Sequence, residues 1–228
     1  MRLIRFEDDA GQVRVGREIS PVTPGGPGRA EPFKGDLFAG GMWTGDEVAV
    51  HRLLCPLVPR NIICVGANYA EHVRESGLPI PEKPVLFMKP TSAAVGPTDD
   101  IRLPKVCGQE VDYECELAIV IGKEGRDIAK ENALDHVLGY TAANDVSARK
   151  WQKEGGGGQW VRGKSFDTFC PLGPAIVTQG TGDDDIADPQ ALKLSTTLNG
   201  QVMQQHTTGD MIFSVADLIA FISCDTTL

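Results

Sequence analysis

Three acidic residues are the part of this sequence best suited to chemistry. Glu114 and Glu116 stand two apart in the apolar segment 111–122, and Asp145 follows a second apolar segment, 140–144. On a β-strand, side chains two apart leave the same face, with Cβ atoms about 7 Å apart. Two like charges there repel each other, and a divalent cation that accepts carboxylate oxygens, Mg²⁺ or Mn²⁺, would compensate them. The alternative is a solvent-facing edge strand, on which charged and core residues also alternate.

The elements that position these carboxylates are predicted from the hydropathy pattern. Within 111–122 every second residue is apolar or aromatic, whereas the acidic residues occupy the alternate positions, which predicts one strand. Residues 140–144 are a second predicted strand, whose end carries the third carboxylate. Residues 147–154 are predicted to be helical, so that Arg149 and Gln152, three apart, share one helical face. A further strand over 161–166 would carry a lysine, Lys164.

A short predicted helix carries a histidine and a glutamate. The composition of 68–77 is helical, Gly77 suits the position after the last turn, and Pro79 forbids continuation. His72 and Glu75, three apart, then lie on one face, where the carboxylate can orient the imidazole and raise its basicity. The alternative is a surface helix on which a histidine and a glutamate are incidental neighbours.

Composition and charge exclude several classes of function. The chain has 228 residues, 41% of them hydrophobic, and a formal net charge of -9, which opposes the phosphate contacts of nucleic-acid binding. Apolar runs such as 117–121 are far shorter than the roughly 20 residues of a membrane span, and the first residues have the pattern of neither a signal nor a transit peptide. Six cysteines without C-x-x-C pairs indicate free thiols. We therefore expect a cytoplasmic protein with neither a nucleic-acid nor a membrane partner.

Three motifs resemble those of a known family. Y-E-C-E-L-A begins at Tyr113, N-D-V-S-A-R at Asn144 and G-K-S-F-D at Gly163. Their order and spacing resemble the fumarylacetoacetate hydrolase family, including its fumarylacetoacetate hydrolase domain-containing branch. The resemblance extends from about residue 61 to residue 221, and the three motifs together are quite specific.

The resemblance implies a fold of the α+β class that is mainly β. It consists of a mixed β-roll catalytic domain, here residues 59–228, preceded by a small N-terminal domain, here residues 1–58. Family members continue beyond the helix that begins at Ser214 into strands with a Thr-Gly-Thr-Pro segment, which this sequence lacks. The catalytic domain is therefore expected to be C-terminally incomplete.

The resemblance also implies roles for individual residues, a Mg²⁺ or Mn²⁺ cofactor and a homodimer. The implied roles are Glu114, Glu116 and Asp145 as metal ligands, His72 and Glu75 as the proton relay of a mobile lid helix, Lys164 as the active-site lysine, and Lys89, Arg149 and Gln152 as substrate-binding residues. The substrate would be a small 2-oxo or 2,4-dioxo acid that binds the metal.

Three functions are consistent with such a site. The first is C–C bond hydrolysis of an acylpyruvate-type substrate, in which His72, assisted by Glu75, deprotonates the attacking water, and the metal and Lys164 stabilise an enolate. The second is an oxaloacetate decarboxylase or keto–enol tautomerase, in which His72 or Lys164 need only move a proton. The third is a catalytically inactive, truncated metal-binding remnant.

Overall fold

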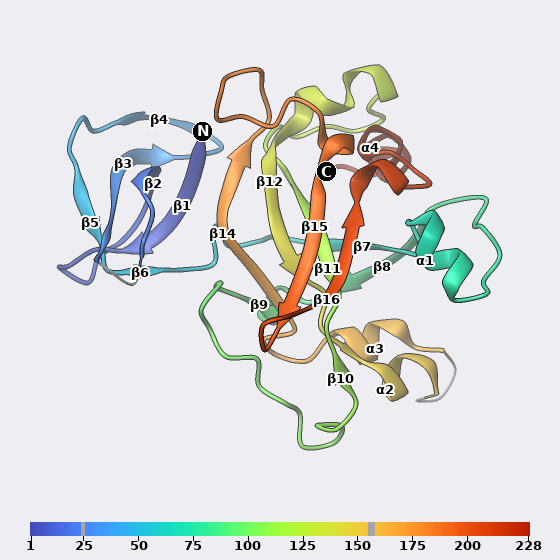
Figure 1. The fold of residues 1–228 in the computed structure, drawn as a ribbon. Helices are drawn as coiled ribbons and strands as arrows, with labels where there is room; N and C mark the ends of the chain where they lie inside the picture. The colour runs from blue at the N-terminus through green and yellow to red at the C-terminus, as the bar shows by residue number, and fades with distance from the viewer. Residues whose placement is uncertain (24–25, 155–157) are drawn as a thin grey trace.

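A computed structural model describes residues 1–23, 26–154 and 158–228. Its main feature is one large, mostly antiparallel sheet that runs through the molecule (Figure 1). The predicted mainly β fold is thus confirmed. In spatial order its principal strands are β11 (Cys115–Ile121), β12 (Val137–Asn144), β14 (Cys170–Thr178), β1 (Arg2–Glu7), β2 (Val13–Ser20), β3 (Gly28–Asp36) and β4 (Gly40–Trp43).

The N-terminal strands lie at one end of this sheet, in blue in Figure 1. Strand β5 (Val48–Val50) pairs with β3, and β6 (Arg52–Leu53) pairs with β1. Strand β1 also hydrogen-bonds β14, with Leu3 opposite Ile176. The sheet therefore continues from the N-terminal segment into the rest of the chain, and a domain boundary at residue 58 stays a prediction.

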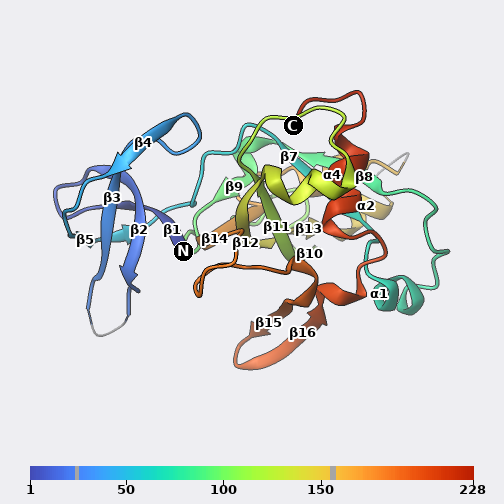
Figure 2. The same ribbon diagram turned by 90° about the horizontal axis from the view of Figure 1, so that it is seen from above.

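Shorter elements surround the other end of the sheet (Figure 2). Three small two-stranded sheets are β7 (Ile62–Gly66) with β8 (Val85–Lys89), β10 (Val111–Asp112) with β13 (Ser147–Ala148), and β15 (Lys193–Leu198) with β16 (Gln201–Thr207). Strand β9 (Ala94–Val95) runs parallel to β14. The helices are α1 (Ala70–Glu75), α2 (Arg149–Lys153), α3 (Trp160–Lys164) and α4 (Val215–Ser223), with 3₁₀ turns η1 (Thr91–Ala93), η2 (Lys130–His136), η3 (Pro189–Ala191) and η4 (Thr208–Asp210).

The core beside β11 and β12 is closed by α4 and η2. Helix α4 begins at a capping box, in which Ser214 and Asp217 satisfy each other's backbone N–H groups. Its apolar face, including Val215 and Ile219, packs on the fully buried Tyr140 of β12. Burial of this face fixes β12, and with it the position of the residue that follows the strand.

Two predicted elements near the site were wrong in type. The predicted strand 161–166 is wrong, because residues Trp160–Lys164 form helix α3, which packs tightly on α2: a Cβ at Gly163 would lie 2.6 Å from the backbone nitrogen of Gln152. Residues 111–122 are not one strand either, since the ladder breaks between β10 and β11, at Tyr113 and Glu114. In both cases tertiary contacts override a short local pattern.

Asn68 fastens the start of α1 to the loop before α4. Its side-chain amide donates to the Phe213 carbonyl at 3.0 Å, and the Phe213 N–H donates back to its oxygen at 2.9 Å.

Because Asn68 is buried, Asn68→Ala leaves both backbone groups unpaired, and we expect the free energy of unfolding to fall by about 2–3 kcal/mol. Urea unfolding measures this, and Asn132→Ala, at an exposed asparagine, should stay within about 0.5 kcal/mol. Equal effects of the two substitutions would contradict a stabilising role of these two hydrogen bonds.

Candidate metal and substrate site

Glu114 and Asp145 are brought together by the backbone. Glu114 lies in the break before β11, and Asp145 directly follows β12, the neighbouring strand. The Asp145 N–H donates to the Glu114 carbonyl at 2.9 Å, and the Glu114 N–H donates to the Asn144 side chain at 3.1 Å. The break in the ladder thus turns one predicted carboxylate toward another.

Lys164 joins these two carboxylates. Its ammonium donates to Glu114 Oε2 at 2.6 Å and to Asp145 Oδ2 at 2.7 Å, and the residue is only 1% exposed. The ring of Phe87 lies 5.2 Å from the same nitrogen, and Trp160 packs edge-on against that ring. The lysine is therefore a buried cation, held by two anions and an aromatic face.

A second buried lysine reaches the cluster from strand β8. The Lys89 ammonium donates to Asp145 Oδ1 at 2.5 Å and to the Val146 carbonyl at 3.1 Å. Lys89 is 2% exposed. Asp145 is thus paired through one oxygen with Lys89 and through the other with Lys164, which fixes the plane of its carboxylate.

Arg149 and Gln152 of α2 close the cluster on its outer side. The Arg149 guanidinium donates to Asp112 Oδ2 at 2.8 Å, to the Glu114 carboxylate, and to Gln152 Oε1 at 3.2 Å. The spacing of three that suggested a shared face is therefore realised as a direct contact. An open hollow of about 520 Å³ lies beside Arg149, and its lining includes Lys150 and Lys153.

Glu116, on β11, differs from the other two acids. Its carboxylate forms no hydrogen bond or ion pair with the residues in the described ranges. Burial raises the pKa of Glu116, as do the Glu114 and Asp145 charges, to about 8, although Lys164 acts in the opposite direction. The cluster therefore holds one carboxylate that lacks a cation.

These residues fit a hard divalent ion by their chemistry. Mg²⁺ and Mn²⁺ prefer carboxylate oxygens, and the donor set here is three carboxylates, one of them without a partner. In this structure, however, the described residues contain no group of three or more His, Cys, Asp or Glu side chains that is arranged to hold a metal ion. The Lys164 ammonium bridges Glu114 and Asp145, two of these three carboxylates.

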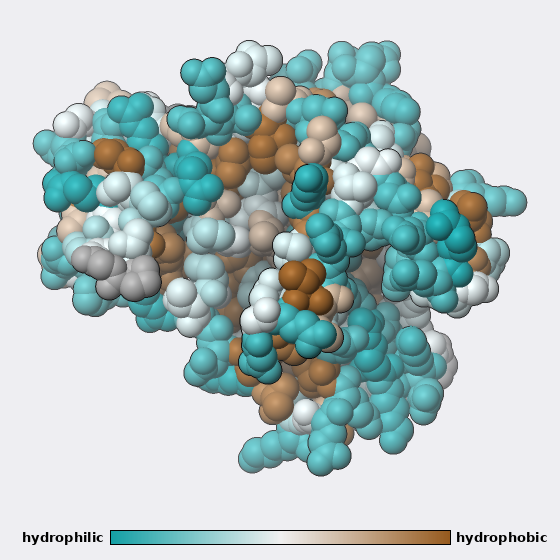
Figure 3. All heavy atoms as spheres, viewed as in Figure 1, coloured by the Kyte–Doolittle hydropathy of each residue, from teal (hydrophilic) through white to brown (hydrophobic). Residues whose placement is uncertain are grey.

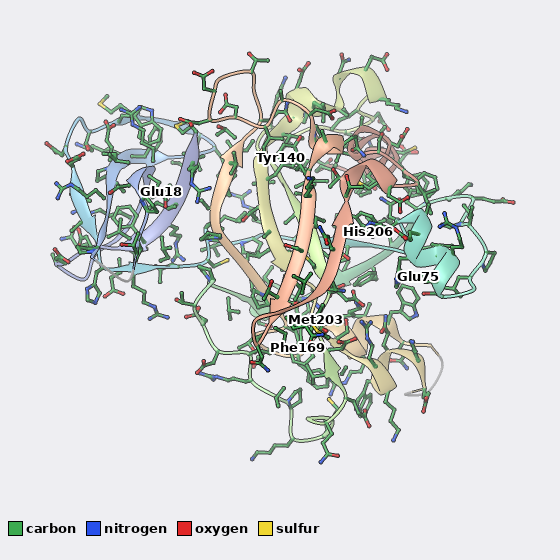
Figure 4. The ribbon with its side chains drawn as sticks, viewed as in Figure 1. Glu18, Glu75, Tyr140, Phe169, Met203 and His206 are labelled. Carbon is green, nitrogen blue, oxygen red and sulfur yellow. The ribbon has the colours of Figure 1, made fainter. Side chains whose placement is uncertain are left out.

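His72 and Glu75 are not part of this cluster. Both side chains are exposed on α1, and neither forms a hydrogen bond or ion pair with a described residue. Figure 4 shows Glu75 on α1, at the edge of the molecule, and Figure 3 shows that the surface around α1 is largely hydrophilic. Their role as a proton relay stays a prediction.

An aromatic side of the cluster, formed by Phe87 and Trp160, is not among the features predicted from the sequence. Phe87 is two residues before Lys89 on one strand, so the alternation of side chains already placed both on the same face. Trp160, by contrast, lies near Phe87 only because α3 is a helix. No local pattern indicates that contact.

The profile of the fumarylacetoacetate hydrolase C-terminal domain matches residues 61–228. The chain belongs to the fumarylacetoacetate hydrolase family. This confirms the resemblance seen in its motifs.

Two curated relatives of the chain are informative. The chain is 50% identical over 177 residues to the mitochondrial oxaloacetate tautomerase fahd2 of Xenopus laevis, which covers 77% of this chain and 54% of the relative. It is also 50% identical over 165 residues to the mitochondrial oxaloacetate tautomerase FAHD2A of Homo sapiens, covering 72% and 51%. The chain thus spans about half the length of these curated relatives.

Solved structures of family members match the whole chain. The 2-hydroxyhepta-2,4-diene-1,7-dioate isomerase of Mycobacterium marinum has a TM-score of 0.83 at 39% identity, covering 100% of this chain and 83% of its own. The 5-carboxymethyl-2-hydroxymuconate delta-isomerase of Mycobacterium smegmatis has a TM-score of 0.85 at 38% identity, covering 100% and 84%. The chain therefore shares the fold of these family members over its full length.

The expected cytoplasmic location gains no support from the two oxaloacetate tautomerases described above, because both are mitochondrial. In the part of the chain that the structure describes, none of the helices has the length and apolar character needed to cross a membrane.

Proposed function

We propose that this chain catalyses proton transfer next to the 2-oxo group of a small 2-oxo dicarboxylic acid of the oxaloacetate type, interconverting its keto and enol forms. The observation that carries the proposal is the buried Lys164 ammonium between Glu114 and Asp145. This ammonium is a proton donor inside the cluster, whereas the predicted water-activating pair, His72 and Glu75, is exposed on α1. Relatives named tautomerases and isomerases, whose reactions relocate a proton, support the same choice.

The charges of the site favour a dianionic substrate. In a chain of formal net charge -9, three cations, Lys89, Lys164 and Arg149, converge on one cluster. Cations gathered in a partly buried site attract carboxylates and raise their local concentration. Arg149, with its planar fork of N–H donors, is suited to orient one substrate carboxylate.

The proposed cofactor is Mg²⁺ or Mn²⁺, and Glu114, Glu116 and Asp145 are the residues that would hold it. When bound, such an ion polarises the 2-oxo group and so acidifies the neighbouring C–H group. Lys164 must then leave its bridging position, because its ammonium and the ion would compete for the same oxygens of Glu114 and Asp145.

Each step of the proposed reaction uses a group of this chain. The released Lys164 ammonium donates a hydrogen bond to the 2-oxo oxygen and stabilises the negative charge that develops there. In the keto-to-enol direction the 2-oxo oxygen takes a proton from the Lys164 ammonium, and the adjacent carbon gives up one proton to the resulting Lys164 amine, so the lysine ends as an ammonium again. The enol-to-keto direction runs the same two transfers in reverse. Gln152, only 7% exposed, keeps Arg149 in orientation through their hydrogen bond. No water is consumed, so the reaction needs no activated nucleophile.

The experiment that tests the reaction type compares two substrates in the parent and in His72→Ala. With Mg²⁺ present, we expect both proteins to convert enol-oxaloacetate to its keto form at rates within about threefold, because His72 lies outside the cluster. The matched control is His51→Ala, at another exposed histidine that lies outside the cluster. Efficient Mg²⁺-dependent cleavage of an acylpyruvate by the parent, lost in His72→Ala, would instead establish the hydrolase.

We also propose a homodimer. Leu86 and Met88 leave the same face of strand β8 and are both exposed, and exposed apolar side chains on one sheet face support association. Light scattering of the purified chain measures its mass directly, and a monomer at all concentrations would refute the dimer.

A further inference from the structure

The hydroxyl of Tyr69 is buried and has no hydrogen-bond partner among the described residues. Buried hydroxyl groups in native proteins are nearly always paired, because an unpaired one loses its hydrogen bonds to water without replacement. Such an atom in a family of enzymes points to a partner that is bound during function.

Several contacts hold this tyrosine in place. Its ring stacks on His206 of β16, with ring centroids 5.1 Å apart and planes 28° apart, and its backbone pairs with Met211. The His206 Nε2 lies 3.5 Å from Asp210 Oδ2, and the same oxygen accepts the Glu71 N–H at 2.8 Å. Figure 4 shows His206 on the strand that lies toward α1. The hydroxyl therefore has a fixed position at the beginning of α1.

The environment of the hydroxyl connects it with the carboxylate cluster. Burial raises the pKa of the Tyr69 hydroxyl most, followed by the charges of Glu116, Cys115 and Asp210. Tyr69 therefore stays a neutral hydrogen-bond donor at physiological pH. Glu116, the first of these charges, is also the carboxylate without a partner, and its neighbour Cys115 is the residue to which the β15–β16 hairpin is hydrogen-bonded.

A contact between the β15–β16 hairpin and strand β11 also connects Tyr69 with the carboxylate cluster. Gln204 of β16 accepts the Cys115 N–H at 2.9 Å and the Thr196 hydroxyl at 2.9 Å. The β15–β16 hairpin is thereby fastened to β11 directly beside Glu116, and the same hairpin carries the His206 ring that stacks on Tyr69. The same hairpin thus contacts both Tyr69 and the beginning of β11, the strand that carries Glu116.

We infer that the Tyr69 hydroxyl donates a hydrogen bond to an anionic oxygen of the bound 2-oxo acid, beside Glu116. Tyr69 is then a catalytic residue, in addition to those that the motifs indicate. The inference rests on the proposed function, since it takes its ligand from there. His206 acts through the tyrosine and is a positioning residue.

The test uses Tyr69→Phe in the full chain, with oxalate as probe, because oxalate is a planar dianion similar in shape to the enolate of a 2-oxo acid. We expect calorimetry in Mg²⁺ to show oxalate affinity about tenfold lower than in the parent, the effect of losing one hydrogen bond to a charged group. The kcat/KM for oxaloacetate should fall by a similar factor. The unfolding midpoint in urea should be unchanged or higher, because the substitution removes an unpaired buried hydroxyl.

The matched control is Tyr140→Phe, at a core tyrosine whose hydroxyl donates to Gln179. It should show the reverse pattern, a lower unfolding midpoint with unchanged oxalate affinity. If Tyr69→Phe binds oxalate and turns over oxaloacetate like the parent, or if it lowers the unfolding midpoint as Tyr140→Phe does, the role of Tyr69 is refuted while the proposed function stands. If the parent neither binds oxalate nor acts on oxaloacetate, both are refuted.

Discussion

Lys164→Met is expected to lower the free energy of unfolding in EDTA by about 3 kcal/mol. Removing one member of a buried ion pair costs about 3–5 kcal/mol, and the lower value applies because Glu114 keeps Arg149 and Asp145 keeps Lys89. Urea unfolding measures the effect. Lys83→Met, at an exposed lysine, is the control and should stay within about 0.5 kcal/mol.

The same variant separates metal binding from catalysis. If Glu114 and Asp145 hold Mg²⁺ as proposed, the ion would compete in the parent with the Lys164 ammonium for their oxygens, whereas Lys164→Met removes this competitor. We therefore expect the variant to bind Mg²⁺ more tightly by calorimetry, to regain stability in Mg²⁺, and yet to be at least about a hundredfold less active on oxaloacetate. Unchanged Mg²⁺ affinity together with unchanged activity would contradict the role given to this lysine.

Glu116→Gln is expected to have the opposite effect on stability. The folded-state pKa of Glu116, about 8, lies above its ordinary value of 4.5, so its protonated form is favoured by folding. The parent in EDTA should therefore lose stability as the pH rises from about 4.5 to about 8, and the loss should be on the order of a few kcal/mol. Glutamine does not titrate, so Glu116→Gln should be more stable than the parent at pH 8, by urea unfolding in EDTA.

The metal dependence of this variant gives a second result. At a Mg²⁺ concentration about a hundred times the dissociation constant, the parent gains about 2.7 kcal/mol, and Glu116→Gln should lose most of this gain. Glu131→Gln, at an exposed glutamate, is the control and should retain it. A variant that binds Mg²⁺ as the parent does would show that Glu116 is not a ligand.

The sequence predicted the acidic centre better than the elements around it. The placement of Asp145 after a buried strand was predicted from hydropathy alone, and the motifs identified the family. Glu114 was assigned to a continuous strand, but it lies where the ladder breaks, and this break brings its carbonyl to the Asp145 N–H. Alternation over a few residues cannot show such a break, because the partner strand decides it.

The cations were harder to predict than the acids. Lys164 was expected on a strand, yet its position between two carboxylates depends on α3 packing on α2 through Gly163. The sequence pattern gives Tyr69 no role of its own. Its hydroxyl has no hydrogen-bond partner among the described residues, and the His206 ring that stacks on it belongs to a hairpin more than a hundred residues later. Contacts of this kind are set by the assembled core, and no local spacing encodes them.

The most direct test of the account follows the ultraviolet absorbance of enol-oxaloacetate with the parent, Glu116→Gln and Lys164→Met, each in Mg²⁺ and in EDTA. We predict that the parent in Mg²⁺ accelerates decay of the enol above the rate of Mg²⁺ in buffer. In EDTA the parent should not do so, and neither variant should do so in either condition. A parent that leaves the rate unchanged in Mg²⁺, or that accelerates it equally in EDTA, would contradict a metal-assisted proton transfer at this cluster.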